Sequence, residues 1–550
     1  MLLAIVASLG HPSDTADVER AYLNAFSLDK NLVVIAGDHM FPLPRASLLI
    51  MALYGTKRAA LGWEVKADAI MESLDYKRMR IARGIYLKFH QETGALIRAY
   101  RHSDDFYLTS PDQIINDQQG DLIRGKIGMS PFVVPTRFLG LECERIHHIT
   151  GLPDTLGKLI LLRQTAKIEQ AEVLFELAFE KYFPRKDRQV STPVPLDYNI
   201  DVSLLSPLMA RPCDKKEKLL MQSIVGTEIW LTSSVCRWGT FATYVSASST
   251  STPIIRDLYN ALYHLKFIIQ EKHTPLVLGG DFPIDIRGTS DCSLGTGRKG
   301  KSVITWNASL NEKAGAVGAF TTSTNFALCN ISHGETESMV KCTHLQVYIR
   351  NVLEELGYLS GDSKPVLVQG DNKASISFAH GGPVSNLSRH LNQRVMAIRN
   401  YCEEGVATYE HIPTELNTAD LGTKAMGPGL FRMHARNLQG HRLLDSLPIK
   451  IRGYKEIAIP ELDEDLVQLI DTLAIDSGMG SDFDTMVLAE LLHMQEEEQF
   501  VNEINWTVND YFLSNAYLFR LDVSSAEEQP VLMATDENGS VPALSEWINN

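Results

Sequence analysis

The sequence has 550 residues, of which 44% are hydrophobic and 22% are charged. This length predicts two to four domains with substantial cores, and no apolar run is long enough to cross a lipid bilayer. The seven cysteines are scattered without a Cys-x-x-Cys pair, which argues against a zinc site and favours a reducing compartment.

The charge of the chain is distributed unevenly. From Glu456 to Asn550 there are 21 acidic residues and one basic residue, Arg520, while the whole chain has a net charge of −15. The preceding part is therefore mildly basic and could follow nucleic-acid phosphates, whereas the acidic tail would repel them.

The first apolar stretch runs from Met1 to Ser8. No basic region precedes it and no small-residue cleavage site is clear. We therefore expect this stretch to be part of a core and not a signal peptide.

Three aspartates in the first 110 residues have the pattern of a metal site. Asp104 and Asp105 are adjacent in a Ser-Asp-Asp sequence, which is typical of turns. A tight hairpin at this place, flanked by apolar residues, would let both carboxylates reach a metal ion that Asp17 also binds.

The segments that hold these aspartates resemble the catalytic motifs of copia-type reverse transcriptases. The resemblance implies that Asp17, Asp104 and Asp105 bind the polymerase metals and that Tyr22 blocks a ribose 2′-hydroxyl. The sequence departs from the family at Arg58 and Ala60, where Gln and Pro are usual, and at His102-Ser103, where Tyr-Val is usual. Only the last piece of the family's fingers region matches the residues before Asp17, so the resemblance also implies missing fingers.

The next segments have no chemistry that we can assign. Phe138–Arg145 resembles the strand that follows the palm in the same family. We expect a helix from Ile160 to Phe183, then a linker rich in Pro and basic residues, and a further helix that starts at Thr252-Pro253. Apolar residues at intervals of three and four give that helix one apolar face: Ile255, Leu258, Leu262, Leu265 and Ile269.

Four acidic residues in separate elements follow between Ile284 and Ala425. Asp291 follows an alternating apolar run, Glu335 opens a long helical pattern, Asp371 ends an apolar run, and Asp420 lies just past another. Carboxylates at strand ends and helix starts can meet at one edge of a sheet, where they would repel unless divalent cations lie between them. Two Mg²⁺ ions about 4 Å apart, held by carboxylates, can cut a phosphodiester by in-line attack of water.

The segments around these acids resemble the ribonuclease H domain of Ty1/copia-type retrotransposon polyproteins. They occur in the order Ser290–Ser293, His333–Ser338, Gly370–Ser375, Ser388–Leu391 and His411–Ala425. The resemblance implies hydrolysis of the RNA strand of an RNA–DNA hybrid, with two Mg²⁺ ions held by Asp291, Glu335, Asp371 and Asp420. It also implies substrate contacts by Arg298, Lys299, Arg389 and His390.

The apolar patterns predict an α/β chain. The resemblance implies that an α+β reverse-transcriptase palm remnant occupies residues 1–190 and that a thumb-like helical connection occupies 191–282. A ribonuclease H-like mixed five-stranded sheet with flanking helices would occupy 283–445, and an acidic, mostly helical extension 446–550. In the third part we expect strands at 302–310, 316–322, 365–371 and 406–412 and helices at 335–356 and 386–404.

A competing motif lies inside the third part. Gly295–Ser302 satisfies the phosphate-loop pattern G-x-x-x-x-G-K-[ST], with Lys301 as its lysine. A phosphate loop must follow a strand and open a helix. The β-branched run that starts at Ser302 favours a basic hairpin, so the NTPase reading is the less favoured alternative.

The leading hypothesis is a retrotransposon-derived enzyme that uses Mg²⁺. Its partners would be an RNA–DNA hybrid and an RNA template with a DNA primer, and it would act in cytoplasmic virus-like particles or in the nucleus. Its polymerase activity would be impaired. The second hypothesis is a catalytically decayed remnant that binds nucleic acid or protein. The acidic tail, with expected helices at 462–475 and 484–504, could bind a protein partner.

Overall fold

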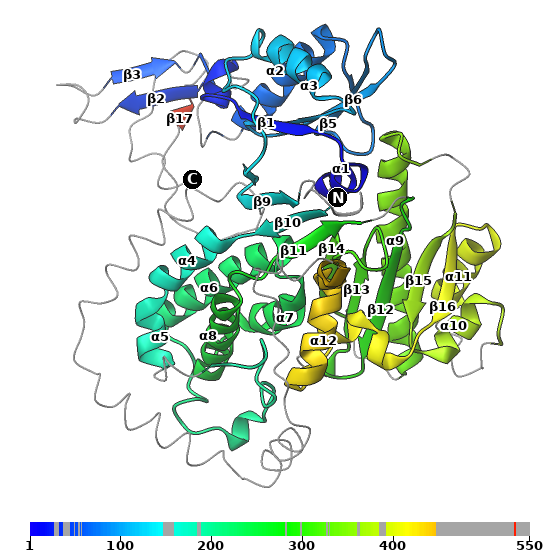
Figure 1. Ribbon diagram of the computed structural model, residues 1–550. Helices are drawn as coiled ribbons and strands as arrows, with labels where there is room; N and C mark the ends of the chain where they lie inside the picture. The colour runs from blue at the N-terminus through cyan, green and yellow to red at the C-terminus, as the bar shows by residue number, and fades with distance from the viewer. Residues whose placement is uncertain are drawn as a thin grey trace. The chain divides into compact units, whose positions relative to one another are not determined.

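The computed structural model describes residues 1–26, 32–36, 45–48, 50–52, 56, 58–146, 159–183, 189–280, 283–297, 300–325, 328, 330–359, 364–383, 392–446 and 533–534. The chain divides into two units (Figure 1). Unit 1 contains Met1–Gly10 and Gly140–Ser514, and unit 2 contains His11–Leu139 and Asn515–Asn550. The predicted boundaries at residues 190, 282 and 445 stay predictions, and the two helices expected in the tail lie outside the described residues. Among the described helices, none combines the length and apolarity that a membrane crossing needs.

Unit 2 is built on an antiparallel sheet with the strand order β1-β7-β6-β5-β4. Its strands are β1 (Ser13–Asp17), β4 (Lys77–Arg78), β5 (Ile85–Phe89), β6 (Leu96–His102) and β7 (Asp105–Thr109). The other elements are η1 (Ala21–Asn24), α2 (Ala59–Ser73), α3 (Gln113–Arg124), β8 (Arg137–Phe138), and the small sheet of β2 (Leu32–Ala36), β3 (Arg45–Leu48) and β17 (Met533–Ala534). A buried core that includes Trp63, Tyr86 and Phe106 joins α2 to the large sheet.

A small antiparallel sheet opens the main part of unit 1. It pairs β9 (Leu141–Ile146) with β10 (Leu159–Arg163), and β10 with β11 (Leu276–Gly279). Helix α1 (Leu2–Leu9) packs on β10 and β11, and Ala4 to Ser8 are buried. This placement confirms the expected core role of the first apolar stretch.

The predicted helix from Ile160 to Phe183 is wrong in its first turn. Leu159–Arg163 is the central strand β10, and the helices α4 (Thr165–Leu174) and α5 (Glu176–Tyr182) follow it. The four residues Leu159 to Leu162 are all buried, because a central strand with both faces covered reads as a continuous apolar run. Periodicity alone cannot distinguish such a run from a buried helix.

A helical region follows, with η3 (Val202–Leu204), α6 (Lys215–Ser234), η4 (Arg237–Gly239), α7 (Thr240–Ser249) and α8 (Ile255–Gln270). A capping box fixes the start of α6. The Asp214 side chain accepts the backbone N–H of Glu217, and the Glu217 side chain accepts the backbone N–H of Asp214. Helix α8 is confirmed, but it begins at Ile255, since the Asp257 carboxylate accepts the N–H of Ile254 and so sets the first turn. Its apolar face forms part of a buried core with α4, α5 and α6.

The second sheet of unit 1 has the order β14-β13-β12-β15-β16. Its first three strands pair antiparallel, and β12, β15 and β16 pair parallel. The strands are β12 (Arg287–Ser293), β13 (Val303–Ala308), β14 (Gly318–Ser323), β15 (Val366–Gly370) and β16 (Ala407–His411). The predicted five-stranded mixed sheet is therefore confirmed, and the ends of the four strands with predicted bounds are shifted by one or two residues.

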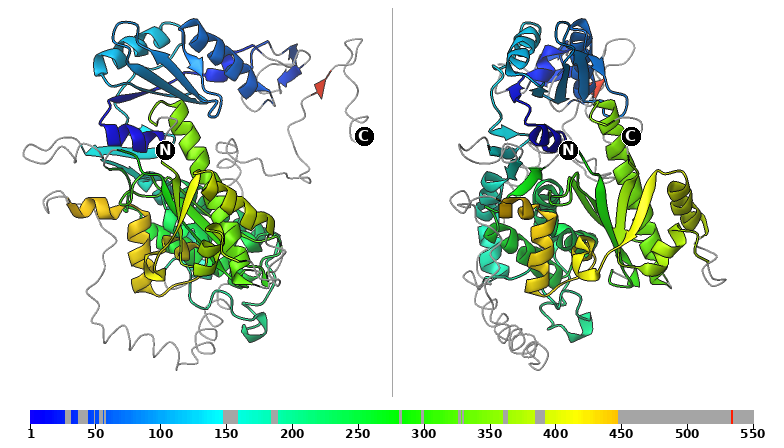
Figure 2. Two further views of the ribbon diagram at one scale, coloured as in Figure 1. Left: turned by 90° about the vertical axis from the view of Figure 1, so that its right-hand side faces the viewer. Right: turned by 45° about the vertical axis from the view of Figure 1, so that its right-hand side comes forward.

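Helices cover both faces of this sheet. They are α9 (Ile331–Glu355), α10 (Lys373–Ala379), α11 (Asn392–Glu403), η7 (Thr414–Leu416), η8 (Thr418–Gly422), α12 (Pro428–Leu438) and η9 (His441–Ser446). Helices α9 and α11 lie on one face, and η8 with α12 lies on the other (Figure 2). The predicted helix over 335–356 starts four residues earlier, because the side chain of Asn330 caps it by accepting the N–H of Ser332.

The NTPase alternative is not supported by the structure. The segment from Gly295 to Ser302 joins the antiparallel strands β12 and β13, so no helix follows it. The Ser302 side chain is buried and accepts the N–H of Gly295 at 3.4 Å. A phosphate loop needs a helix N-terminus behind the phosphates, and this hairpin supplies none.

Candidate metal centre and polymerase-like site

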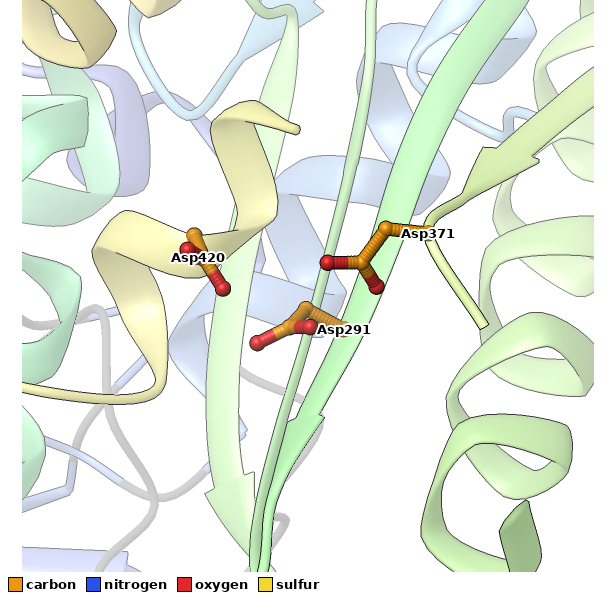
Figure 3. Close-up of side chains that lie close together, drawn as sticks. All are labelled: Asp291, Asp371 and Asp420. Carbon is orange, nitrogen blue, oxygen red and sulfur yellow. The ribbon is translucent and has the colours of Figure 1, made fainter. Parts of the chain in front are cut away.

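Three of the four predicted acids of the second sheet meet at one place. Asp291 lies on the central strand β12, Asp371 follows the end of β15, and Asp420 lies in η8 (Figure 3). One carboxylate oxygen of each lies within 4.8 Å of the others. Their side chains point toward a shared space, although the sequence separates the first from the last by more than a hundred residues.

A hydrogen-bond donor from residues 414–424 holds one oxygen of each carboxylate. Thr423 Oγ1 donates to Asp291 Oδ2 at 2.5 Å, and Thr414 Oγ1 donates to Asp371 Oδ2 at 2.9 Å. Lys424 Nζ lies 2.9 Å from Asp420 Oδ1, and its side chain is 43% exposed. These donors leave the other oxygen of each carboxylate available to a cation, so they can orient the carboxylates as ligands.

Glu335 is the fourth predicted acid, and it lies next to the other three. It is buried in the first turns of α9, outside the group of three whose oxygens all approach one another. Burial raises the pKa of its carboxyl to about 10, and the charges of Asp291 and Asp371 add to the rise, against a hydrogen bond from the backbone of Cys292. Its role as a metal ligand stays a prediction.

The clustering also raises the pKa of Asp291. Burial is the main cause, the charge of Asp420 adds to it, the hydrogen bond from Thr423 opposes it, and the result is a pKa of about 7. Burial lowers the pKa of Lys424, but the carboxylates of Asp420, Asp291 and Asp371 stabilise its ammonium more strongly. The net effect is a raised pKa. A divalent cation would relieve the repulsion among the carboxylates more strongly than one ammonium does.

These shifts predict how pH changes the stability of the metal-free protein. The unfolded chain releases the Asp291 proton near pH 4, whereas the folded chain keeps it to about pH 7. The folded state therefore binds more protons in this window, and the Asp291 contribution to the free energy of unfolding falls as pH rises from about 4 to about 7. Urea denaturation in chelator, compared with the Asp291→Asn variant, should show the steeper fall in the wild type. Equal slopes in the two proteins would contradict this expectation.

The three aspartates predicted for a polymerase site lie near one another in unit 2. The hairpin of β6 and β7 pairs His102 with Asp105, so Ser103 and Asp104 form its two-residue turn, and Asp17 pairs with Asp105 across β1 and β7. Burial raises the pKa of Asp105 to about 6, with the charges of Asp104 and Asp17 adding to it. Among the described residues, these three carboxylates do not form a group with all ligand oxygens within 4.8 Å.

Buried side chains hold this turn from two sides. Trp63 Nε1 of α2 donates to the carbonyl oxygen of Ser103 at 2.7 Å, and the hydroxyls of Ser103 and Tyr22 lie 3.0 Å apart. The φ angle of Ser103 is 55°, in the left-handed region. Ser103 stands where the family usually has Val, and its hydroxyl holds the hydroxyl of Tyr22. Tyr22 is the residue predicted to block a ribose 2′-hydroxyl.

Tyr22 is the one predicted substrate contact that lies among the described residues. Arg298, Lys299, Arg389 and His390 lie outside the described residues. Sequence reasoning missed Thr414, Thr423 and Lys424, although all three belong to the segment His411–Ala425 that carried the resemblance. For Thr423 and Lys424, the position within four residues of Asp420 was the available signal, because such neighbours can fold back on a ligand.

One family model and several solved structures are similar to parts of this chain. A family model described as "Reverse transcriptase (RNA-dependent DNA polymerase)" matches residues 1–158, which confirms the predicted resemblance in that part. Solved structures with similarity include LC11-RNase H1 in complex with an RNA/DNA hybrid, at 17% identity over 25% of this chain and 94% of that one, with a TM-score of 0.20. RNase H1 from Halobacterium salinarum has 12% identity over 24% and 90%, with a TM-score of 0.19.

A longer match is the foamy viral protease-reverse transcriptase in complex with an RNA/DNA hybrid. It has 11% identity and a TM-score of 0.38, and it covers 75% of this chain but 45% of that one. The fold assignment rests on the strand order and register described above. The chain combines a segment that matches reverse transcriptases with a ribonuclease H-like α/β fold.

Proposed function

We propose that this chain is a retrotransposon-derived nuclease that hydrolyses the RNA strand of RNA–DNA hybrids with two Mg²⁺ ions. The observation that carries the proposal is the convergence of Asp291, Asp371 and Asp420 at one edge of the sheet. Three buried or half-buried carboxylates this close would repel one another strongly unless a cation lies among them.

The donor set fits a hard divalent cation. All three side chains offer carboxylate oxygens, and the group contains no His or Cys. Oxygen ligands suit Mg²⁺ or Mn²⁺, whereas zinc sites usually add nitrogen or sulfur. When bound, such cations supply Lewis-acid stabilisation of the charge that develops on the scissile phosphate.

The chain's own residues would hold and orient this site. Thr423 and Thr414 fix the rotation of the Asp291 and Asp371 carboxylates, which keeps their free oxygens directed at the shared space. Glu335 adds a fourth carboxyl from the α9 side of the sheet. The half-exposed Lys424 marks a solvent-accessible side of the cluster, where a phosphate could approach.

A cleavage assay tests the proposal. The full chain with Mg²⁺ should cut the RNA of a labelled RNA–DNA hybrid, should spare a DNA duplex of the same sequence, and should stop when chelator is added. The Glu335→Gln variant should cut at least about tenfold more slowly, because a carboxyl at the metals is lost. A wild-type chain that binds the hybrid without Mg²⁺-dependent cleavage would favour the second candidate, a decayed nucleic-acid-binding remnant.

The second part of the proposal is that the chain descends from an RNA-directed DNA polymerase but has little polymerase activity. The looser spacing of Asp17, Asp104 and Asp105 supports it, since polymerase metals need carboxylates that reach the same ions. We expect primer extension on an RNA template to be weak or absent, and no faster than with Asp104→Asn. Robust extension by the wild type that this substitution removes would contradict it.

The proposal includes two features of cellular context. The family resemblance suggests cytoplasmic virus-like particles or the nucleus as the location. The acidic segment after Glu456 would repel nucleic acid, so a protein partner is its proposed ligand.

A further inference from the structure

The segment that carries Asp420 has few means of fixing its own position. η8 is five residues long, and all of Ala419 to Gly422 are buried. A short 3₁₀ turn has poor internal hydrogen bonds. The position of Asp420 must therefore come from the surfaces that press on η8 from either side.

One of these surfaces is the sheet. The carbonyl oxygen of Gly422 accepts hydrogen bonds from Thr305 Oγ1 on β13 at 2.6 Å and from Thr321 Oγ1 on β14 at 3.1 Å. A Cβ atom at Gly422 would lie 2.4 Å from Thr305 Cγ2. The turn is thus in direct contact with the strands, with no room for a side chain between them.

The other surface belongs to the helical region before the second sheet. Leu421, next to Asp420, lies in one buried cluster with Trp238 of η4, Phe267 of α8 and Phe431 of α12. The Trp238 and Phe267 rings pack edge to face at 4.9 Å, and Phe431 packs on both, at 6.3 and 5.4 Å. η4 also contacts η8 directly. The buried core of the helices therefore extends to Leu421, the neighbour of the predicted metal ligand Asp420.

We propose that Trp238 is a positioning residue for Asp420, so that the connection helices and the nuclease metal site form one cooperative unit. The inference rests on the proposed function, because it concerns the same metal site. Trp238 touches neither metal nor substrate; it acts through the buried cluster that it shares with Leu421, the residue next to Asp420 in η8. Shortening Trp238 would let η8 relax away from the carboxylates on β12 and β15.

The test measures Mn²⁺ binding to the full chain by titration calorimetry without nucleic acid, well below the unfolding temperature. Trp238→Ala should weaken Mn²⁺ binding about tenfold, as losses behind a metal ligand do. Trp238→Phe should recover most of the affinity, because it keeps a ring against Phe267 and Phe431. Leu421→Ala, a smaller truncation in the same buried cluster, should weaken binding in the same direction if the tryptophan variant fails to fold.

The matched control is Phe175→Ala. Phe175 is 1% exposed in the same cluster, at the junction of α4 and α5, which pack on α8. It should lower the urea midpoint by an amount comparable to Trp238→Ala while changing the Mn²⁺ affinity less than about twofold.

Two outcomes would overturn the inference. If Phe175→Ala and Trp238→Ala weaken Mn²⁺ binding equally, Trp238 acts only through general stability, and the proposed nuclease stands. If the folded wild-type chain binds no Mn²⁺, the proposed function fails together with the inference.

Discussion

Replacing Asp291 with asparagine is expected to abolish cleavage of RNA–DNA hybrids and to stabilise the metal-free protein. The carboxylate lies on the central strand, nearly fully buried beside Asp371 and Asp420. Losing a metal ligand removes several kcal/mol of transition-state stabilisation, which corresponds to a rate loss on the order of a thousandfold. Removing a buried like charge should raise the free energy of unfolding in chelator at pH 8 by about 2 kcal/mol.

The two effects are measured separately, by single-turnover hybrid cleavage with Mg²⁺ and by urea denaturation with chelator. The control is Asp121→Asn on α3, where the carboxylate is 79% exposed; it should change neither quantity appreciably. The opposite signs of the two effects are the diagnostic feature. A loss of activity accompanied by a loss of stability would mean that Asp291 is a structural residue and would contradict the metal-centre assignment.

Replacing Gly334 with alanine is expected to destabilise unit 1 by about 3 kcal/mol, as overpacking of a closely packed site does. A Cβ at this position of α9 would lie 2.0 Å from Cys292 Sγ and 3.1 Å from both Cys292 Cβ and Leu328 Cδ1. Cys292 follows Asp291 on β12, and Glu335 follows Gly334 on α9. The displacement should therefore also weaken hybrid cleavage, because it separates two of the acids.

The double variant Gly334→Ala with Cys292→Ala should recover part of the stability, since it removes the sulfur atom and leaves the contacts at 3.1 Å. The matched control is Gly429→Ala on α12, where a Cβ would meet nothing within 4 Å; it should be neutral or slightly stabilising, because alanine favours helix. Urea denaturation gives all four values. Equal stability of Gly334→Ala and the wild type would show that α9 can move away from β12 at little cost.

The sequence predicted the second sheet well because its strands are bounded by clear signals. Asp371 follows a short apolar run and Gly357 ends the long helix, so the order of strands and helices could be read directly. The acids at the strand ends then had to meet at one edge. The approach of Asp291 on β12 to Asp371 after β15 follows from strand order, whereas Asp420 reaches them from η8 and Glu335 lies beside them on α9.

Other features depend on tertiary contacts that no local pattern records. Leu159–Arg163 has the composition of a buried helix, and only its pairing with β9 and β11 makes it a strand. The hydrogen bonds of Thr423 and Thr414 to the acids depend on how η7 and η8 fold back across the sheet. The role inferred for Trp238 is the hardest to predict from the sequence, because more than 180 residues separate it from Asp420.

The assignment of α1 to unit 1 makes His11–Leu139 of unit 2 an insertion between two parts of unit 1. The chain leaves unit 1 after Gly10 and returns to it at Gly140, while α1 stays packed on β10 and β11. The chain therefore passes between the two units at three points, after Gly10, after Leu139 and after Ser514, because Asn515–Asn550 also belongs to unit 2. A single proteolytic nick near Gly10 would leave the first ten residues bound as a non-covalent peptide, and loss of unit 2 by unfolding would not by itself uncover the apolar surface of β10 and β11 that α1 shields.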